Sequence, residues 1–128
     1  MKFTTRLTVG VALSLLASTA FAYDPDWKRG REYYRSVCTS CHVAELVGSI
    51  DPSSKTKAEW AAYLQADKHA KCRDTVSKYV SKDYRASIKF AKKAAEKFAE
   101  TPDQELKDDI KAFLIKGAKD GDAPTTCN

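Results

Sequence analysis

The sequence predicts an all-α fold made of a few short helices. Only 5 glycines and 4 prolines occur among 128 residues, which is too few for the many tight turns of an all-β domain. Apolar residues recur instead every three or four positions along several segments, which is the spacing of one helix face. The segments TKAE and TPDQ also have the pattern of helix starts. Together these observations favour one small helical domain.

The first 22 residues differ in kind from the rest of the chain. Lys2 and Arg6 precede an apolar run that ends in the small-residue sequence AFA, which is the layout of a secretory signal peptide. The run is shorter than the roughly 20 apolar residues that a membrane-spanning helix needs, although an uncleaved anchor is the alternative. We expect cleavage after Ala22, a periplasmic location, and a single mature domain of residues 23–128 without a membrane span.

The first half of the mature chain predicts two helices. One runs from about Pro25 or Asp26 to Cys41, with an apolar side at helical spacing. That side consists of Trp27, Gly30, Tyr34 and Val37. A loop follows across residues 48–54, which are rich in Gly, Pro and Ser. Thr56 and Glu59 then form a capping box that begins a short second helix.

The second half predicts two further helices. One starts near Ser81 and has a narrow buried side that recurs at helical spacing through residue 98. That side consists of Tyr84, Ile88, Ala91, Ala95 and Phe98. The last helix begins with Thr101 as N-cap, Pro102 as first helical residue and Gln104 completing a capping box. It ends at Gly117, and its buried stripe consists of Leu106, Ile110, Phe113 and Leu114.

The charge pattern excludes a nucleic-acid partner. The net charge is +5, and it falls to +3 once Lys2 and Arg6 leave with the leader. Acidic and basic residues alternate along the helices, whereas a nucleic-acid interface needs clustered Lys and Arg with interleaved aromatic residues.

Residues 38–42, CTSCH, carry the clearest chemical signal. A thioredoxin-type dithiol needs a helix that starts at the first cysteine, but here the predicted helix precedes both cysteines. A zinc site usually needs two close pairs of ligands, and Cys72 and Cys127 stand alone. Disulfide bonding among the four cysteines, with three possible pairings, is a further reading. Covalent haem attachment uses the whole motif, with thioethers at Cys38 and Cys41 and iron coordination by His42.

The segment GREYYRSVCTSCH resembles the N-terminal helix of class I c-type cytochromes. In that family a glycine, an aromatic residue and the first haem cysteine follow at intervals of four, as Gly30, Tyr34 and Cys38 do here. DDIKAFLIK is similar to the family's C-terminal helix, with Ile110 and Phe113 at the matching positions. The resemblance implies a small cytochrome c-like helical domain wrapped around one covalently bound haem c. It also implies that the two helices cross closely, with Gly30 facing Phe113.

The resemblance leaves the second axial position of the iron open. High-potential members of the family place a methionine there, but the only methionine of this chain, Met1, belongs to the expected signal peptide. His69 is then the candidate distal ligand. A vacant position is one alternative, and a lysine is the other, with Lys92, Lys93 and Lys97 as candidates.

Two further expectations follow once the motif is taken as a haem attachment site. Cys72 and Cys127 become a candidate disulfide pair that would anchor the segment carrying His69, with intermolecular pairing as the alternative. Aromatic and aliphatic residues of the middle helices are expected to supply the haem wall. They are Trp60, Tyr63, Leu64, Tyr84, Ile88 and Phe98.

The function that the resemblance implies is electron transfer. We expect a periplasmic, bis-histidine, low-potential cytochrome that is not an enzyme and that docks transiently with redox partner proteins. The alternative is a five-coordinate or displaceable-ligand haem protein that binds or senses small diatomic molecules. A peroxidase would need distal acid–base groups, for which only His69 with Arg73 or Arg85 is available.

Overall fold

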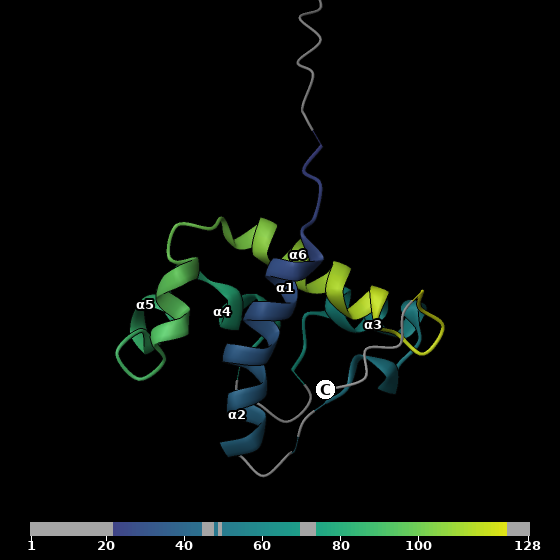
Figure 1. Ribbon diagram of the computed structural model, residues 1–128, viewed down its shortest axis with the longest axis horizontal. Helices are drawn as coiled ribbons and strands as arrows, with labels where there is room; N and C mark the ends of the chain where they lie inside the picture. The colour runs from purple at the N-terminus through teal and green to yellow at the C-terminus, as the bar shows by residue number, and fades with distance from the viewer. Residues whose placement is uncertain (1–21, 45–47, 49, 70–73, 123–128) are drawn as a thin grey trace, which may run out of the picture.

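The computed structural model describes residues 22–44, 48, 50–69 and 74–122 (Figure 1). These residues form helices and contain no strand, so the predicted all-α class is confirmed. None of the helices in these ranges is long and apolar enough to cross a membrane. Residues 1–21 of the expected signal peptide (1–22) lie outside the described residues, and so do both cysteines of the candidate disulfide, Cys72 and Cys127.

Three helical segments follow one another without a break at the start of the domain. They are α1 (Trp27–Tyr33), the π-helical turn η1 (Tyr34–Cys38) and α2 (Thr39–Ala44). The Asp26 carboxylate caps the first turn by accepting hydrogen bonds from the backbone amides of Lys28 and Arg29, at 2.9 and 3.3 Å. In Figure 1 this blue helix runs down the centre of the molecule. The first predicted helix is thus confirmed, and it continues past Cys41 so that His42 is itself helical.

The second predicted helix is confirmed as α3 (Lys57–Ala66), which follows the short 3₁₀ turn η2 (Pro52–Ser54). Thr56 and Glu59 form the expected capping box, with both reciprocal hydrogen bonds present. The indole nitrogen of Trp60 donates to the Pro52 carbonyl oxygen at 2.7 Å. This bond fixes α3 against the turn that precedes it.

The predicted single helix from Ser81 to Phe98 is wrong. The chain forms α4 (Val76–Val80), α5 (Lys82–Ile88) and the 3₁₀ helix η3 (Lys93–Phe98), with a turn at residues 89–92. The buried Arg85 guanidinium donates to the Phe98 carbonyl oxygen. An unbroken helix would separate these two residues by about 20 Å. The contact therefore requires the chain to turn back, although no Gly or Pro marks the place.

The last helix is α6 (Asp103–Lys116), and it ends at Gly117 as expected. Its predicted capping box is wrong, because the Thr101 hydroxyl makes no cap. The Gln104 amide donates along the helix to Asp108 at 3.0 Å, and the Asp103 carboxylate accepts the Lys82 amide at 2.9 Å. The Asp103 side chain thus satisfies a free amide at the start of α5, and no side chain caps the start of α6.

The first and last helices cross closely at Gly30. A Cβ atom there would lie 2.0 Å from the Asp109 carbonyl oxygen and 2.7 Å from the Ile110 nitrogen. One turn further on, the rings of Tyr34 and Phe113 lie 5.4 Å apart. The close crossing that the resemblance implies is present, but Gly30 faces Asp109 and Ile110, and it is Tyr34 that faces Phe113.

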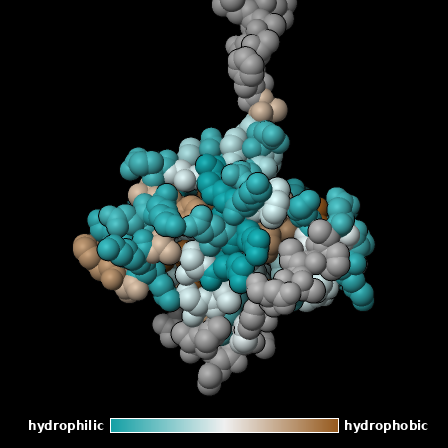
Figure 2. All heavy atoms as spheres, in the orientation of Figure 1, coloured by the Kyte–Doolittle hydropathy of each residue, from teal (hydrophilic) through white to brown (hydrophobic). Residues whose placement is uncertain are grey.

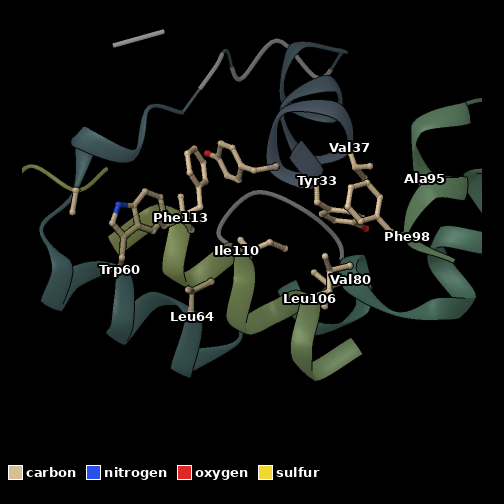
Figure 3. Close-up of a cluster of buried hydrophobic side chains, with 13 residues drawn as sticks. Tyr33, Val37, Trp60, Leu64, Val80, Ala95, Phe98, Leu106, Ile110 and Phe113 are labelled. Carbon is tan, nitrogen blue, oxygen red and sulfur yellow. The ribbon is translucent and has the colours of Figure 1, made fainter. Parts of the chain in front are cut away.

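A single buried apolar cluster lies along α6. Figure 3 shows side chains from the first helix and from α3 facing the apolar stripe of α6, while Phe98 of η3 packs against Tyr33 of the first helix. The Tyr33 and Phe98 rings pack edge to face, with centroids 5.1 Å apart. The stripe predicted for the last helix is confirmed, since Leu106, Ile110, Phe113 and Leu114 are all buried.

A buried carboxylate, that of Asp109, connects residues 23–29 to α6. The Asp109 side chain is fully buried and accepts hydrogen bonds from the Tyr23 hydroxyl, the Asp26 amide and the Arg29 guanidinium. Burial and the hydrogen bond to Asp109 raise the pKa of Tyr23 to about 12. The phenol of Tyr23 therefore stays protonated in the folded protein at pH values where a free tyrosine ionises.

We expect Tyr23→Phe to lower the free energy of unfolding at neutral pH by about 1 kcal/mol. Folding raises the pKa of Tyr23. The contribution of its phenol to the free energy of unfolding is therefore fully present below pH 10 and is lost as the pH rises towards 12. The variant should therefore lose stability less steeply over that range. Urea unfolding at a series of pH values measures this. Tyr63→Phe, whose hydroxyl has no hydrogen-bond partner in the described structure, is the control, and parallel profiles for Tyr23→Phe and the wild type would contradict the prediction.

Candidate functional site

A cavity of about 360 Å³ lies between the first helix, α3, α4 and α6. This volume falls within the range of about 300–1,000 Å³ that is typical of small-molecule and cofactor sites. Most of its wall is apolar or aromatic, with Trp60, Leu64 and Leu114 among the contributors (Trp60 and Leu64 in Figure 3). Apart from its tyrosines and Trp60, the described wall contains five residues with polar side chains: Cys38, His42, Ser54, Lys55 and His69.

Two histidines distant in the sequence meet in this cavity. The ring centroids of His42 and His69 lie 5.7 Å apart, and the ring planes are inclined by 41°. The Nδ1 atoms of both rings are buried without a hydrogen-bond partner. Burial lowers the pKa of both imidazoles, and the neighbouring His69 lowers that of His42 further. Both rings are therefore neutral at pH 7, which is the form that coordinates a metal ion.

The separation of the two rings fits a metal ion between them. Two imidazoles that bind one metal ion from opposite sides, at metal–nitrogen distances of about 2.0 Å, have centroids about 6 Å apart. Buried histidine nitrogens without partners are uncommon in proteins unless a ligand engages the ring. No group of three or more His, Cys, Asp or Glu side chains within the described ranges could hold a metal ion by itself. The described wall thus offers two neutral imidazoles to such an ion.

The local helix explains how Cys38 and His42 of the motif reach the same cavity as Tyr34. Tyr34, Cys38 and His42 follow one another at intervals of four, so that they lie on one side of the continuous first helix. His42 is buried, and Cys38 is half-buried. The side of this helix that begins with Gly30 at the helix crossing thus continues into the cavity.

Tertiary contacts of Asp67 and of His69 itself hold the chain that follows α3. Asp67 ends α3 in the left-handed conformation, with φ of 50°, and its carboxylate accepts the Ser77 amide at 2.8 Å and pairs with Lys107 at 3.5 Å. The His69 ring contacts the Tyr79 ring edge to face, at 5.4 Å. These contacts join the end of α3 to α4 and to α6, and they leave the His69 ring beside the His42 ring.

The two motif cysteines are not paired with each other. Burial and the neighbouring Cys41 raise the pKa of the Cys38 thiol to about 12. A catalytic dithiol needs the opposite shift, towards a stable thiolate at a helix N-terminus. Cys41 lies 3.7 Å from the Tyr84 hydroxyl. The geometry of Cys38, within a continuous helix and beside the cavity, thus argues against a redox dithiol.

Several predicted site residues are not at the cavity. The three candidate lysines do not line its described wall, and Lys97 pairs with Glu32 at 2.8 Å on the surface. The Arg85 guanidinium donates to the carbonyl oxygens of Phe98 and Thr101, away from the cavity, so Arg85 is not a distal acid–base group. Arg73 lies outside the described residues. Trp60, Tyr63 and Leu64 do line the cavity as expected, whereas the three wall residues expected from the helix after Ser81 do not: Tyr84, Ile88 and Phe98.

Other wall residues were missed by the sequence reasoning. Val76, Tyr79 and Val80 line the cavity from α4, and their spacing of three and four residues could have indicated a helix there. Lys55 also lines it, with its ammonium group 5.8 and 6.0 Å from the ring centroids of Trp60 and Tyr63. A single lysine in a loop carries no signal that would predict this position.

No protein-family model, curated protein or solved structure matches this chain. The site is therefore defined by its own residues. They are two neutral histidines whose ring centroids lie 5.7 Å apart in a mostly apolar cavity, with the first cysteine of the CTSCH motif in the same wall.

Proposed function

We propose that this protein is a single-haem c-type cytochrome that transfers electrons in the periplasm. In this proposal Cys38 and Cys41 would hold haem c covalently, and His42 and His69 would coordinate its iron. The observation that carries the proposal is the meeting of the two histidines in one cavity, 5.7 Å apart and with both Nδ1 atoms free of partners. The bound haem supplies an iron that accepts and releases one electron.

The chain's own residues then have defined tasks. The apolar walls from α3, α4 and α6 would pack against the porphyrin and shield it in part from water. Two neutral imidazoles stabilise ferric iron more than a histidine and a methionine do, so we expect a reduction potential below that of methionine-ligated relatives. The small positive net charge suits weak, salt-sensitive docking with redox partner proteins.

A displaceable distal ligand is the second candidate function. His42 is buried within α2, whereas His69 follows α3 outside any helix and is half-buried. A ligand on such a segment can leave the iron and make room for a small diatomic molecule. This would make the protein a sensor or carrier of such molecules rather than an electron carrier.

Covalent haem on the purified protein tests the proposal. Expressed for export in a host that matures c-type cytochromes, the protein should gain the mass of one haem and keep its colour after acid–acetone extraction. The double variant Cys38→Ser, Cys41→Ser should lose both. Ser40→Ala, in the same motif, is the control and should keep them. A colourless wild-type protein of unmodified mass from that host would contradict the proposal.

A further inference from the structure

The turn between α5 and η3 exposes one large apolar side chain. Phe90 is 92% exposed, and the other large hydrophobic residue exposed among the described ones is Tyr23, at 36%. Figure 2 shows a hydrophobic group standing out at the left edge of the molecule, over the turn that follows α5 in Figure 1. A singly exposed hydrophobic residue is common on protein surfaces, so Phe90 indicates an interaction only together with the charges around it.

The same turn carries a local excess of positive charge. Lys89, Lys92 and Lys93 flank Phe90, and no acidic residue occurs between Asp83 and Glu96. The Lys89 ammonium lies 5.1 Å from the centroid of the Phe90 ring. None of the three lysines forms an ion pair within the described structure. The charge at this turn is therefore available to an external anion.

Two backbone amides of the turn form hydrogen bonds within the turn. The amides of Ala91 and Lys92 both donate to the Ile88 carbonyl oxygen, at 3.0 and 2.7 Å. These two amides need no water as partner, which lowers the cost of placing them in a region poor in water. Below the tip, Arg85 bonds to the Phe98 carbonyl oxygen and joins α5 to η3. The fold thus presents Phe90 on a fixed base.

We propose that this turn, residues 89–93, docks the protein on the surface of an anionic phospholipid membrane. Phe90 enters the boundary between headgroups and acyl chains, and the lysines contact lipid phosphates. An isolated aromatic ring flanked by lysines suits a lipid interface, whereas a protein interface surrounds its aromatic anchor with further packed residues. The described surface supplies no such second large apolar residue beside Phe90. The docking is independent of the proposed haem.

Co-sedimentation with lipid vesicles tests the docking. The purified protein should bind vesicles of equimolar phosphatidylglycerol and phosphatidylcholine at low ionic strength, and bind pure phosphatidylcholine vesicles far more weakly. Phe90→Ala should lower the partition coefficient about tenfold, and Lys93→Gln about fivefold. Lys111→Gln, an exposed lysine on α6, is the matched control and should bind as the wild type does. Thermal unfolding of each variant verifies that it is folded.

A second measurement separates insertion from charge attraction alone. In Phe90→Trp, the added fluorescence should shift to shorter wavelength with the anionic vesicles and should not shift with polyglutamate, a soluble polyanion. Wild-type protein that ignores anionic vesicles, or Phe90→Ala that binds them as tightly as the wild type, would overturn the proposal. An acidic protein would then be the better candidate partner for this turn.

Discussion

Replacing His69 with alanine is expected to change the visible spectrum of the haem-loaded protein from six-coordinate low-spin to high-spin. His69 is the one histidine that the described cavity wall places opposite His42, at 5.7 Å. The methyl group of alanine cannot coordinate iron, and the wall contains no methionine. The variant should also bind carbon monoxide readily. Absorption spectra of the oxidised and reduced protein, with and without carbon monoxide, measure both effects.

Two further variants sharpen this test. Lys68→Ala changes the exposed neighbour of His69 and should keep the low-spin spectrum. His69→Met should restore six-coordinate iron and shift the reduction potential to more positive values, because methionine favours ferrous iron more than a second histidine does. A low-spin spectrum that survives in His69→Ala would show that another residue is the ligand. Carbon monoxide binding by the wild-type protein itself would favour the displaceable-ligand function.

The helices that form from local signals are those that the sequence predicts correctly. The Thr56 capping box, the apolar spacing from Gly30 to Val37, and the stop at Gly117 all act within a few residues, and all are present in the structure. The motif itself also places Cys38 and His42 on one side of a helix. These parts are predictable because each depends on contacts between near neighbours in the chain.

The sequence-based predictions fail where contacts between residues far apart in the chain outweigh the local preference for a helix. Residues 81–98 have the spacing of one helix, yet Arg85 reaches the Phe98 carbonyl oxygen only because the chain turns between them. The contact between His69 and His42 is of the same kind. Sequence reasoning could nominate His69 because residues 23–128 contain no methionine and no histidine besides His42 and His69. The contacts of Asp67 with Ser77 and Lys107, beside His69, are tertiary and carry no such signal.

Replacing Gly30 with alanine is expected to destabilise the protein by at least about 3 kcal/mol, the upper part of the usual range for overpacking. The added methyl group would lie 2.0 Å from the Asp109 carbonyl oxygen and 2.3 Å from its carbonyl carbon. These are backbone atoms of α6, which cannot rotate away as a side chain would. The gain in helix propensity from glycine to alanine, about 1 kcal/mol, is too small to offset this clash.

Relief of the clash would require α1 and α6 to move apart, and that movement has further costs. The Asp109 carboxylate is fully buried and bonds to Asp26 and Arg29 at the start of α1, so separation would leave a buried charge with fewer partners. The urea midpoint of Gly30→Ala should therefore fall well below that of Arg31→Ala, an exposed change at the next position of the same helix. Equal midpoints for the two variants would mean that the helices do not cross as closely as Gly30 allows.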